Sequence, residues 1–219
     1  MSTSVAALIK FEKKLYKQNI ELIAGIDEVG RGSLGGPVVA AAVILPKHTL
    51  FEHAKLEGVN DSKKLSAKKR ALYYKQVLEI AVSIGLGVAS VAEIDSVNIL
   101  QATKLAMKRA IDDLDVVPEY LLIDHLMLDL ELPQRGIVKG DEKSLSIAAA
   151  SIVAKEVRDK MMQEMGKKYP AYGFESNVGY ATLAHREALI EYGYIEGVHR
   201  KSFEPIKSMI VDNKQGILF

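Results

Sequence analysis

The stretch Leu22-Ile-Ala-Gly-Ile26-Asp27-Glu28-Val-Gly30-Arg31-Gly32 decides the fold class and the chemistry of this chain. An apolar run typical of a strand ends in two adjacent carboxylates and then a glycine-arginine-glycine turn. Carboxylates are depleted from strands and are costly to bury without a counter-charge, which a divalent cation can supply. The glycines let backbone N–H groups approach a ligand, and Arg31 adds a fork of donors. The stretch fits either a site for a metal-bound phosphodiester or an exposed acidic turn with Arg31 as its salt-bridge partner.

Outward from this stretch, apolar runs alternate with helical segments. The runs predict strands over Leu22–Asp27, Pro37–Leu45, Ser83–Val91 and Tyr120–Asp124. Helices are predicted over Thr3–Lys17, Ser66–Ile80, Val97–Leu114, Ser144–Lys168 and Thr182–Tyr192, with Ser66 as an N-cap. Because only a short glycine turn joins the first two strands, they must form an antiparallel hairpin. The expected fold class is α/β, with a mixed sheet flanked by helices and a helical C-terminal region.

Length and composition predict one domain in the cytoplasm. The 219 residues are 48% hydrophobic, enough for one core over about residues 20–165, with a helical part over 166–205 and a tail over 206–219. There are no cysteines, which excludes disulfides and thiolate metal sites. The start of the chain lacks the apolar block of a signal peptide. The longest apolar run, Val38–Leu45, is too short to cross a bilayer, so no membrane partner is expected.

Charge gives only a local indication of a nucleic-acid partner. The net charge is +1, so there is no global excess of positive charge. Basic residues concentrate between Lys55 and Lys75, however, and include the pair Lys63 and Lys64. Such a run is more often a solvated helix face, and it becomes a phosphate-contact site only beside the acidic centre.

The glycines after Glu28 fit the spacing of a dinucleotide-binding fingerprint, Gly30-x-Gly32-x-x-Gly35. That fingerprint requires a helix to begin at the glycines, whereas Gly36-Pro37 leads into another strand. The carboxylates upstream would also repel a pyrophosphate. This cofactor site is therefore excluded. A phosphate-binding P-loop is excluded as well, because no Gly-Lys-Ser/Thr follows the glycines.

Two further acids lie at positions where an α/β fold gathers ligands. Asp124 ends the apolar run Leu121–Ile123, at the kind of strand end where sites form, although an aspartate there often only opens a turn. Asp141 precedes a helix of small residues that should lie close to the sheet, and it is predicted to be the N-cap of that helix. A capping carboxylate could still reach a metal. Ser151 and Lys155, one turn apart on this helix, are candidates to face the same centre.

Taken together, these residues resemble bacterial ribonuclease HII, of the type 2 ribonuclease H family. Two mild departures from the family pattern are Ala181, where glycine is expected, and Glu156, where an apolar residue is usual. The matching segments run in family order over residues 22–205: Gly25–Gly32 with Gly35–Pro37, Asn60–Ser66, Ile123-Asp124, Lys139–Asp141, Ile147–Lys155 with Arg158-Asp159, Gly179-Tyr180 with Thr182 and His185, and Arg200–Phe203 with Pro205.

The resemblance implies a ribonuclease H-like core with Asp27, Glu28, Asp124 and Asp141 at one centre. Four negative charges match two dications, and hard oxygen ligands suit Mg²⁺ or Mn²⁺. Two such ions about 4 Å apart activate a water and stabilise the leaving 3′ oxygen. Adjacent residues on a regular strand face opposite sides, so Asp27 and Glu28 share a site only if the strand ends or twists there.

The activity implied is that of an endoribonuclease. It would hydrolyse the RNA strand of RNA–DNA hybrids and cut 5′ of ribonucleotides embedded in duplex DNA, leaving 5′-phosphate and 3′-hydroxyl ends. The implied roles are ribonucleotide removal from DNA and RNA primer processing. A metal-dependent DNA nuclease on a ribonuclease H-like fold, and a non-catalytic nucleic-acid-binding module, are the alternatives.

The resemblance also assigns residues to the substrate. The turn of Gly30, Arg31 and Gly32 would contact the 2′-hydroxyl beside the cut, which is the group that separates RNA from DNA. Tyr180 would stack at the RNA–DNA junction, although without the resemblance it would be a core tyrosine. Lys63 and Lys64 would contact phosphates, which position a duplex without specifying its sequence.

The C-terminus carries a separate motif. Gln215-Gly-Ile-Leu218-Phe219 resembles the short peptide that docks on bacterial sliding clamps. The alternative is a tail whose apolar residues pack on the chain itself or fray.

Overall fold

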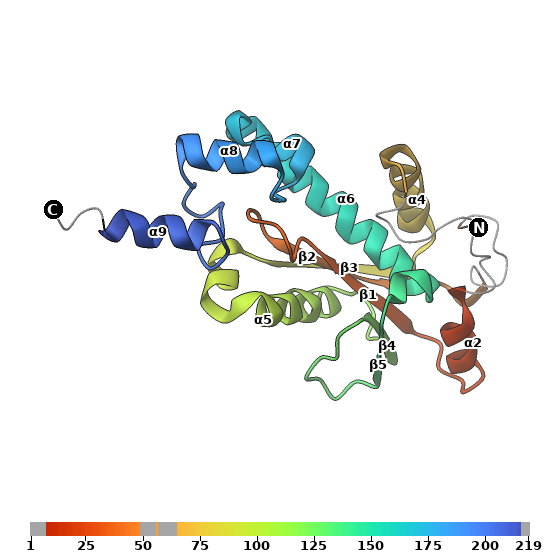
Figure 1. Ribbon diagram of the computed structural model, residues 1–219. Helices are drawn as coiled ribbons and strands as arrows, with labels where there is room; N and C mark the ends of the chain where they lie inside the picture. Colours follow the sequence, from red (N-terminus) through yellow and green to blue (C-terminus); the bar gives the residue numbers. More distant parts are fainter. Residues whose placement is uncertain (1–7, 49–55, 57–64, 216–219) are drawn as a thin grey trace. The chain divides into compact units, whose positions relative to one another are not determined.

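The stretch around Asp27 forms the central strand of a mixed sheet in the computed structural model, which describes residues 8–48, 56 and 65–215 (Figure 1). The described part holds one five-stranded sheet in the order β3-β2-β1-β4-β5. As predicted, β1 and β2 are antiparallel, with Asp27 opposite Ala41. β1 is parallel to β4, and β4 to β5. The strands are β1 Ile23–Val29, β2 Val38–Ile44, β3 Ser83–Ala89, β4 Tyr120–Asp124 and β5 Gln134–Ile137.

The described chain forms two units. The first holds the chain up to Val29, Val39–Val88 and Lys104–Glu156, and the second holds Gly30–Val38, Ala89–Thr103 and the chain from Val157. The single domain predicted from the sequence, with its core ending and its helical part beginning near residue 166, stays a prediction.

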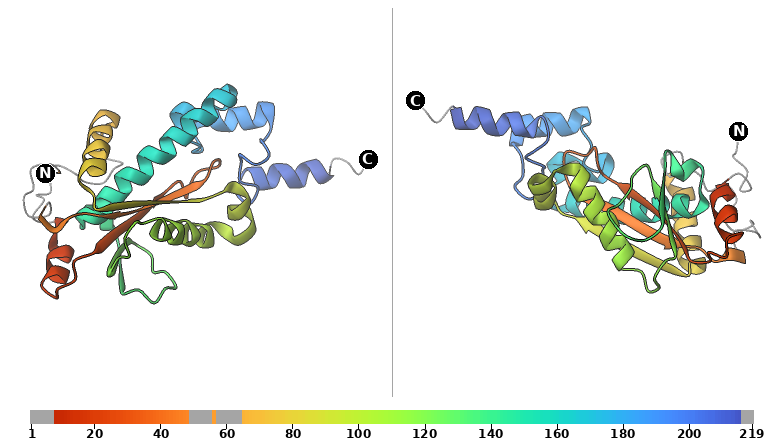
Figure 2. Two further views of the ribbon diagram at one scale, coloured as in Figure 1. Left: turned by 180° about the vertical axis from the view of Figure 1, so that it is seen from behind. Right: turned by 90° about the horizontal axis from the view of Figure 1, so that it is seen from below.

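In the first unit, helices cover both faces of the sheet (Figures 1 and 2). Helix α6 spans Leu145–Lys168, and its residues through Glu156 belong to this unit. Its first turn lies against β1, because a Cβ added at Gly25 would overlap the Ser146 backbone. On the other face, the part of α5 (Val91–Asp112) from Lys104 onward lies on β3, because a Cβ at Gly85 or Gly87 would overlap its backbone. Glycines at these points let helix and strand approach to backbone distance.

The start of α6 is fixed by a residue far away in the sequence. Glu12, on α2 (Lys10–Tyr16), is fully buried and accepts hydrogen bonds from the Ser144 hydroxyl at 2.7 Å and the Ser146 N–H at 3.1 Å. These bonds satisfy groups that a helix start leaves without intrahelical partners. Burial raises the pKa of Glu12. The N-terminal helix thus fixes the element that covers the acidic end of β1.

Helix α4 (Ala67–Ile80) also belongs to the first unit, and its capping prediction is confirmed. Ser66 accepts a hydrogen bond from the Lys69 N–H at 3.4 Å. Arg70 on this helix forms a 2.7 Å ion pair with Glu156, and both side chains are largely buried. This pairing gives a physical reason for an acid at Glu156, where the family pattern has an apolar residue.

The second unit is helical and packs around an aromatic cluster. Tyr172 and Phe174 stack with centroids 5.7 Å apart, and the buried rings of His185 and His199 lie against them. The elements beyond α6 are the 3₁₀ turn η2 (Pro170–Tyr172) and the helices α7 (Phe174–Asn177), α8 (Leu183–Tyr192) and α9 (Ile206–Gln215). Thr182 caps α8 by accepting from the His185 N–H.

Some elements of the described chain were not predicted or have other bounds than predicted. Helix α5 has a first segment from Val91 that was not predicted. It ends at a kink at Asn98 (φ 70°), whose side chain caps the second segment, and this second segment corresponds to the helix predicted from Val97. Strand β5 was missed because its four residues form no apolar run and follow Pro133. Helix α9 was assigned to the tail, although Ile206, Met209 and Ile210 have helical spacing and pack on the aromatic cluster.

No helix in the described part of the chain is long and apolar enough to span a membrane.

Candidate active site

Three of the predicted acids lie together where β1 and β4 end. One carboxylate oxygen each from Asp27, Glu28 and Asp124 lie within 4.8 Å of one another. The cause is the parallel pairing of the two strands, which places Ile26 beside Ile123 and the following residues at the same edge. Such a set of hard oxygen atoms can hold a divalent cation.

Asp27 and Glu28 meet although the strand continues past them. Glu28 remains paired opposite Ala40, and β1 extends to Val29. The two side chains therefore leave the strand on opposite faces, yet an oxygen of each is within 4.8 Å of the other and of Asp124. The sequence analysis allowed Asp27 and Glu28 to share a site only if the strand ended or twisted there. The strand does not end at Glu28.

Asp27 is the most buried acid of the group, with 6% of its surface exposed. Its Oδ1 accepts the Glu28 N–H at 2.7 Å, and the hydroxyl of Ser151 also hydrogen-bonds to its carboxylate. Burial first, and then the charges of Glu28 and Asp124, raise the pKa of Asp27 well above its usual range. These charges repel one another, so a cation at this position would stabilise all of them.

Asp124 is connected to the segment that carries Asp141. Its Oδ1 accepts the Gly140 N–H at 2.6 Å. A Cβ on Gly140 would lie 2.6 Å from Ile147 Cδ1 and 3.2 Å from that same oxygen, so glycine is required for this approach. The short 3₁₀ turn η1 (Gly140–Glu142) is thereby held at the end of β4.

Asp141 lies in η1 with 9% of its surface exposed. It does not belong to the 4.8 Å group, but its negative charge contributes to the raised pKa of Asp27. The prediction that Asp141 is the N-cap of α6 was wrong. Ser144 is the cap, because its hydroxyl accepts the Ile147 N–H at 3.2 Å. The Asp141 side chain is therefore not committed to that capping role.

The predicted substrate residues that the structure describes lie in the second unit. Gly30 is buried, Arg31 is half-buried and Gly32 is exposed. A Cβ placed on Gly32 would lie 3.9 Å from Cε1 of Tyr180, so the turn and the tyrosine are neighbours. Tyr180 keeps 37% of its surface exposed. An exposed aromatic ring beside a backbone turn can stack on a nucleotide while the turn contacts its sugar.

Two buried arginines that the sequence analysis did not assign to the site hold this turn. Arg158 and Arg200 are fully buried. Arg158 donates to the Pro37 and Val178 carbonyls, both at 2.9 Å, and to the Ser33 hydroxyl at 3.0 Å. In the sequence, Arg158 and Arg200 stood out only as members of segments that match the family.

Two predicted groups fall on residues that the structure does not describe. Lys63 and Lys64 lie outside the described residues, as do Leu218 and Phe219. Gln215, the first residue of the motif, is the last residue of α9.

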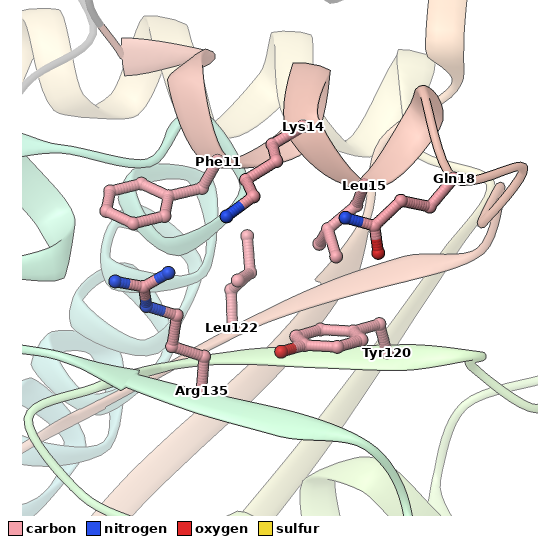
Figure 3. Close-up of a pocket in the computed structure, with 7 residues that line it drawn as sticks. All are labelled: Phe11, Lys14, Leu15, Gln18, Tyr120, Leu122 and Arg135. Atoms are coloured by element: carbon pink, nitrogen blue, oxygen red, sulfur yellow. The ribbon is translucent and has the colours of Figure 1, made fainter.

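A small pocket in the first unit is separate from the acids (Figure 3). It has a volume of about 110 Å³ and includes no predicted site residue. Within it the guanidinium of Arg135 lies 4.9 Å from the centroid of the Phe11 ring. Its lining comes from α2 and the residues after it, and from β4 and β5: Phe11, Lys14, Leu15, Gln18, Tyr120, Leu122 and Arg135.

The mixed sheet and the acids at its adjacent strand ends define a ribonuclease H-like hydrolase. The family model for ribonuclease HII matches residues 24–206. Ribonuclease HII of Enterococcus faecalis is 57% identical over 201 residues, which cover 92% of this chain and 76% of that protein. The chain belongs to the ribonuclease HII family, and it is an enzyme with ribonuclease H activity.

Solved structures have the same fold. Ribonuclease H2 of Pyrococcus horikoshii aligns with a TM-score of 0.73 at 24% identity, over 88% of this chain and 99% of that one. Ribonuclease HII of Archaeoglobus fulgidus, solved as a complex with PCNA, gives 0.68 at 26% identity over 83% and 95%. Bst-RNase HIII in complex with Mn²⁺ gives 0.66 at 21% identity over 89% and 71%.

Proposed function

We propose that this enzyme cuts on the 5′ side of ribonucleotides embedded in duplex DNA, and within the RNA strand of RNA–DNA hybrids, leaving 5′-phosphate and 3′-hydroxyl ends. The observation that carries the proposal is the approach of Asp27, Glu28 and Asp124 to within 4.8 Å. Membership of the ribonuclease HII family supports the substrate class.

The four acids would hold two divalent cations, Mg²⁺ or Mn²⁺. The donor set fits, because it consists of carboxylate oxygens, and burial and then the neighbouring charges of Glu28 and Asp124 raise the pKa of Asp27. The Mn²⁺ complex of Bst-RNase HIII supports this class of ion. When bound, the ions supply activation of the attacking water and stabilisation of the leaving 3′ oxygen.

The side chains around the acids have a preorganising role. Ser151 and the Glu28 N–H orient Asp27, and the Gly140 N–H orients Asp124. Hydrogen bonds of this kind fix the direction of metal ligands before substrate arrives. Asp141, whose segment is attached to Asp124 through Gly140, would complete the ligand set.

Substrate selection would lie with the turn Gly30–Gly32 and with Tyr180. The turn would contact the 2′-hydroxyl of the ribonucleotide, and Tyr180 would stack on the next sugar, which favours deoxyribose because it has no 2′ oxygen to clash. Lys63 and Lys64 would contact backbone phosphates. We place the enzyme in the cytoplasm, with roles in ribonucleotide removal from DNA and in RNA primer processing.

One cleavage assay tests this function. Three duplexes are incubated with the enzyme and Mg²⁺ or Mn²⁺: DNA with one ribonucleotide, an RNA–DNA hybrid, and DNA alone. We expect a single cut 5′ of the ribonucleotide, cuts along the hybrid, no cut in DNA, and no activity with EDTA. Cleavage of the all-DNA duplex at a similar rate would instead support a DNA nuclease.

We also propose that the C-terminal motif Gln215, Leu218 and Phe219 binds a sliding clamp. The PCNA complex of the Archaeoglobus relative supports such a partner. The chain lacking residues 215–219 should lose clamp binding while keeping its cleavage rate on short duplexes. Equal clamp binding by the full and shortened chains would exclude this role.

A further inference from the structure

Two adjacent buried residues, His199 and Arg200, are linked to the two elements to which substrate selection is assigned: Arg200 directly to the turn, and His199 to Tyr180 through His185. Both have no exposed surface. His199 forms an antiparallel bridge with Gly35, and the Arg200 N–H donates to the Leu34 carbonyl at 2.9 Å. This short segment therefore runs beside the chain that follows the Gly30–Gly32 turn.

Arg200 fixes the backbone of the turn. Its guanidinium donates to the carbonyls of Gly30 at 2.6 Å and Arg31 at 2.8 Å, and to that of Gly36 at 2.9 and 3.1 Å. Burial, and then the charge of Arg158, lower the pKa of Arg200 to about 9, so it is still charged at neutral pH. One rigid planar side chain thus holds the turn at Gly30 and Arg31 and fixes it relative to Gly36.

His199 is linked to Tyr180 by a chain of hydrogen bonds whose directions are determined. The Ile195 N–H donates to His199 Nδ1 at 2.8 Å, so the proton of that neutral ring is on Nε2. His199 Nε2 therefore donates to His185 Nε2 at 3.1 Å, and His185 Nδ1 donates to the Tyr180 carbonyl at 2.8 Å. A backbone N–H can only donate and a carbonyl can only accept, so the two ends fix both tautomers.

The chain ends on Tyr180 in a way that leaves its ring available. The carbonyl of Tyr180 is held by His185, and its N–H donates to the Asn177 carbonyl at 2.9 Å. Tyr180 stays 37% exposed as a residue, and the Arg158 guanidinium lies 6.0 Å from the centroid of its ring. The backbone is fixed while the aromatic face can meet a nucleotide.

We propose that His199 and Arg200 are positioning residues that hold the Gly30–Gly32 turn and Tyr180 at one fixed spacing, and that this spacing sets the preference for an RNA–DNA junction. The inference rests on the proposed function, in which the turn contacts a ribose and Tyr180 contacts the following sugar. Two groups that recognise successive nucleotides discriminate only if their separation is rigid, since a misplacement of about 1 Å can cost about 100-fold in rate.

A purely structural role would have a different signature. The ring of His199 also lies 5.2 Å from that of Tyr172, so loss of His199 or His185 could simply weaken the aromatic cluster. That loss would lower stability and reduce cleavage of every substrate in proportion. A positioning role changes the ratio between substrates.

The test compares kcat/KM on the single-ribonucleotide duplex, which has a junction at the cut, and on an RNA–DNA hybrid without one. His185→Leu and Tyr180→Ala should each lower the ratio of the two values by about tenfold, and the double variant should show no further loss. The matched control is Tyr172→Phe, which removes the hydrogen bond from Tyr172 Oη to the Gly193 carbonyl in the same cluster. It should leave the ratio unchanged.

Arg200→Lys keeps the charge but loses the planar fork that holds the turn, so it should lower the same ratio while Mn²⁺ affinity is unchanged. Independently of activity, ¹⁵N NMR of the wild type at pH 7 should show His199 protonated on Nε2 and His185 on Nδ1. Opposite tautomers, an unchanged ratio in His185→Leu, or additive losses with Tyr180→Ala would overturn the inference. A wild type that cuts neither substrate would instead reject the proposed function.

Discussion

Asp27 is the residue on which the chemistry of the site depends most. It is almost fully buried, it is hydrogen-bonded by Ser151, and the charges of Glu28 and Asp124 lie within a few ångströms. Burial and the two neighbouring charges raise the free energy of the ionised form of Asp27, whereas the Ser151 hydrogen bond and a bound cation would lower it. The sequence already marked Asp27 and Asp124 as acids that end apolar strands.

Acid should weaken metal binding through Asp27. Its pKa is raised in the folded protein, so protons compete with the cation for this carboxylate as pH falls below neutral. We expect the cleavage rate at sub-saturating Mg²⁺ to fall between pH 8 and pH 5.5, and excess Mg²⁺ to restore much of it. A rate that is independent of pH over this range would contradict the prediction.

Substitution of Asp124 separates activity from stability. Asp124→Asn should lower the cleavage rate by more than about 100-fold, because losing even an outer partner of a metal ligand costs about 10–100-fold. The Asn Oδ1 can still accept the Gly140 N–H, and one charge that repels Asp27 is removed. The thermal midpoint without metal should therefore rise or stay the same. Asp129→Asn, at an exposed acid outside the group, is the control and should leave both quantities unchanged.

Other site residues could not be predicted from local sequence. Asp141 was expected to cap α6, but Ser144 competes for that role and wins it. Arg158 and Arg200 gave no local signal, because their partners are backbone carbonyls and a hydroxyl from distant segments. A buried charge that is satisfied by carbonyls leaves no complementary residue in the sequence to find.

At the scale of elements, the contact of α6 with β1 positions the acidic end of the strand. Gly25→Ala would place a Cβ on the backbone of Ser146 and Ile147, so the helix or the strand must move. Overpacking of this kind costs about 1–3 kcal/mol or more. We expect a large fall in the free energy of unfolding in denaturant titrations, and reduced activity because Ser151 moves away from Asp27.

The control for this substitution is Gly193→Ala. Its Cβ would meet nothing within 4 Å, so only the cost of a backbone conformation that favours glycine (φ 77°, ψ −170°) applies, about 1–3 kcal/mol. Activity should be retained in this variant. If Gly25→Ala is as stable and active as the control, the close contact between α6 and β1 does not position the site.

Elements with strong periodic patterns were predicted well. The hairpin of β1 and β2, the α4 helix with its Ser66 cap and the long α6 helix follow from apolar periodicity and capping residues. The misses lie where the pattern is short or broken: β5 has four residues, and α5 is interrupted at Asn98. In both cases pairing or a side-chain cap that the periodicity does not contain decides the structure.

At the scale of the whole molecule, the buried histidine pair predicts how stability depends on pH. Burial, and then the charge of His185, lower the pKa of His199 to about 4, and burial lowers that of His185. Between pH 6.5 and pH 4 the unfolded chain therefore binds protons that the folded chain does not. The free energy of unfolding should therefore decrease by about 1.4 kcal/mol for each pH unit that the pH is lowered, for each such proton.

This slope can be assigned to the histidines by substitution. His199→Phe should make the dependence on pH shallower, while His48→Gln, at an exposed position, should not change it. Asp27 contributes with the opposite sign, because its pKa is raised, so the comparison is best made in an Asp27→Asn background. An unchanged slope in His199→Phe would show that this residue is not buried in its neutral form.

The central claim is that acids from separate strands and η1 form one centre for divalent cations. Diffraction from crystals soaked in Mn²⁺, recorded with anomalous scattering, tests it most directly. We predict anomalous peaks in direct contact with carboxylate oxygens of Asp27, Glu28 and Asp124, and their loss in Asp124→Asn crystals soaked in the same way. Manganese found only elsewhere on the protein, or bound equally by the Asp124→Asn variant, would contradict the account.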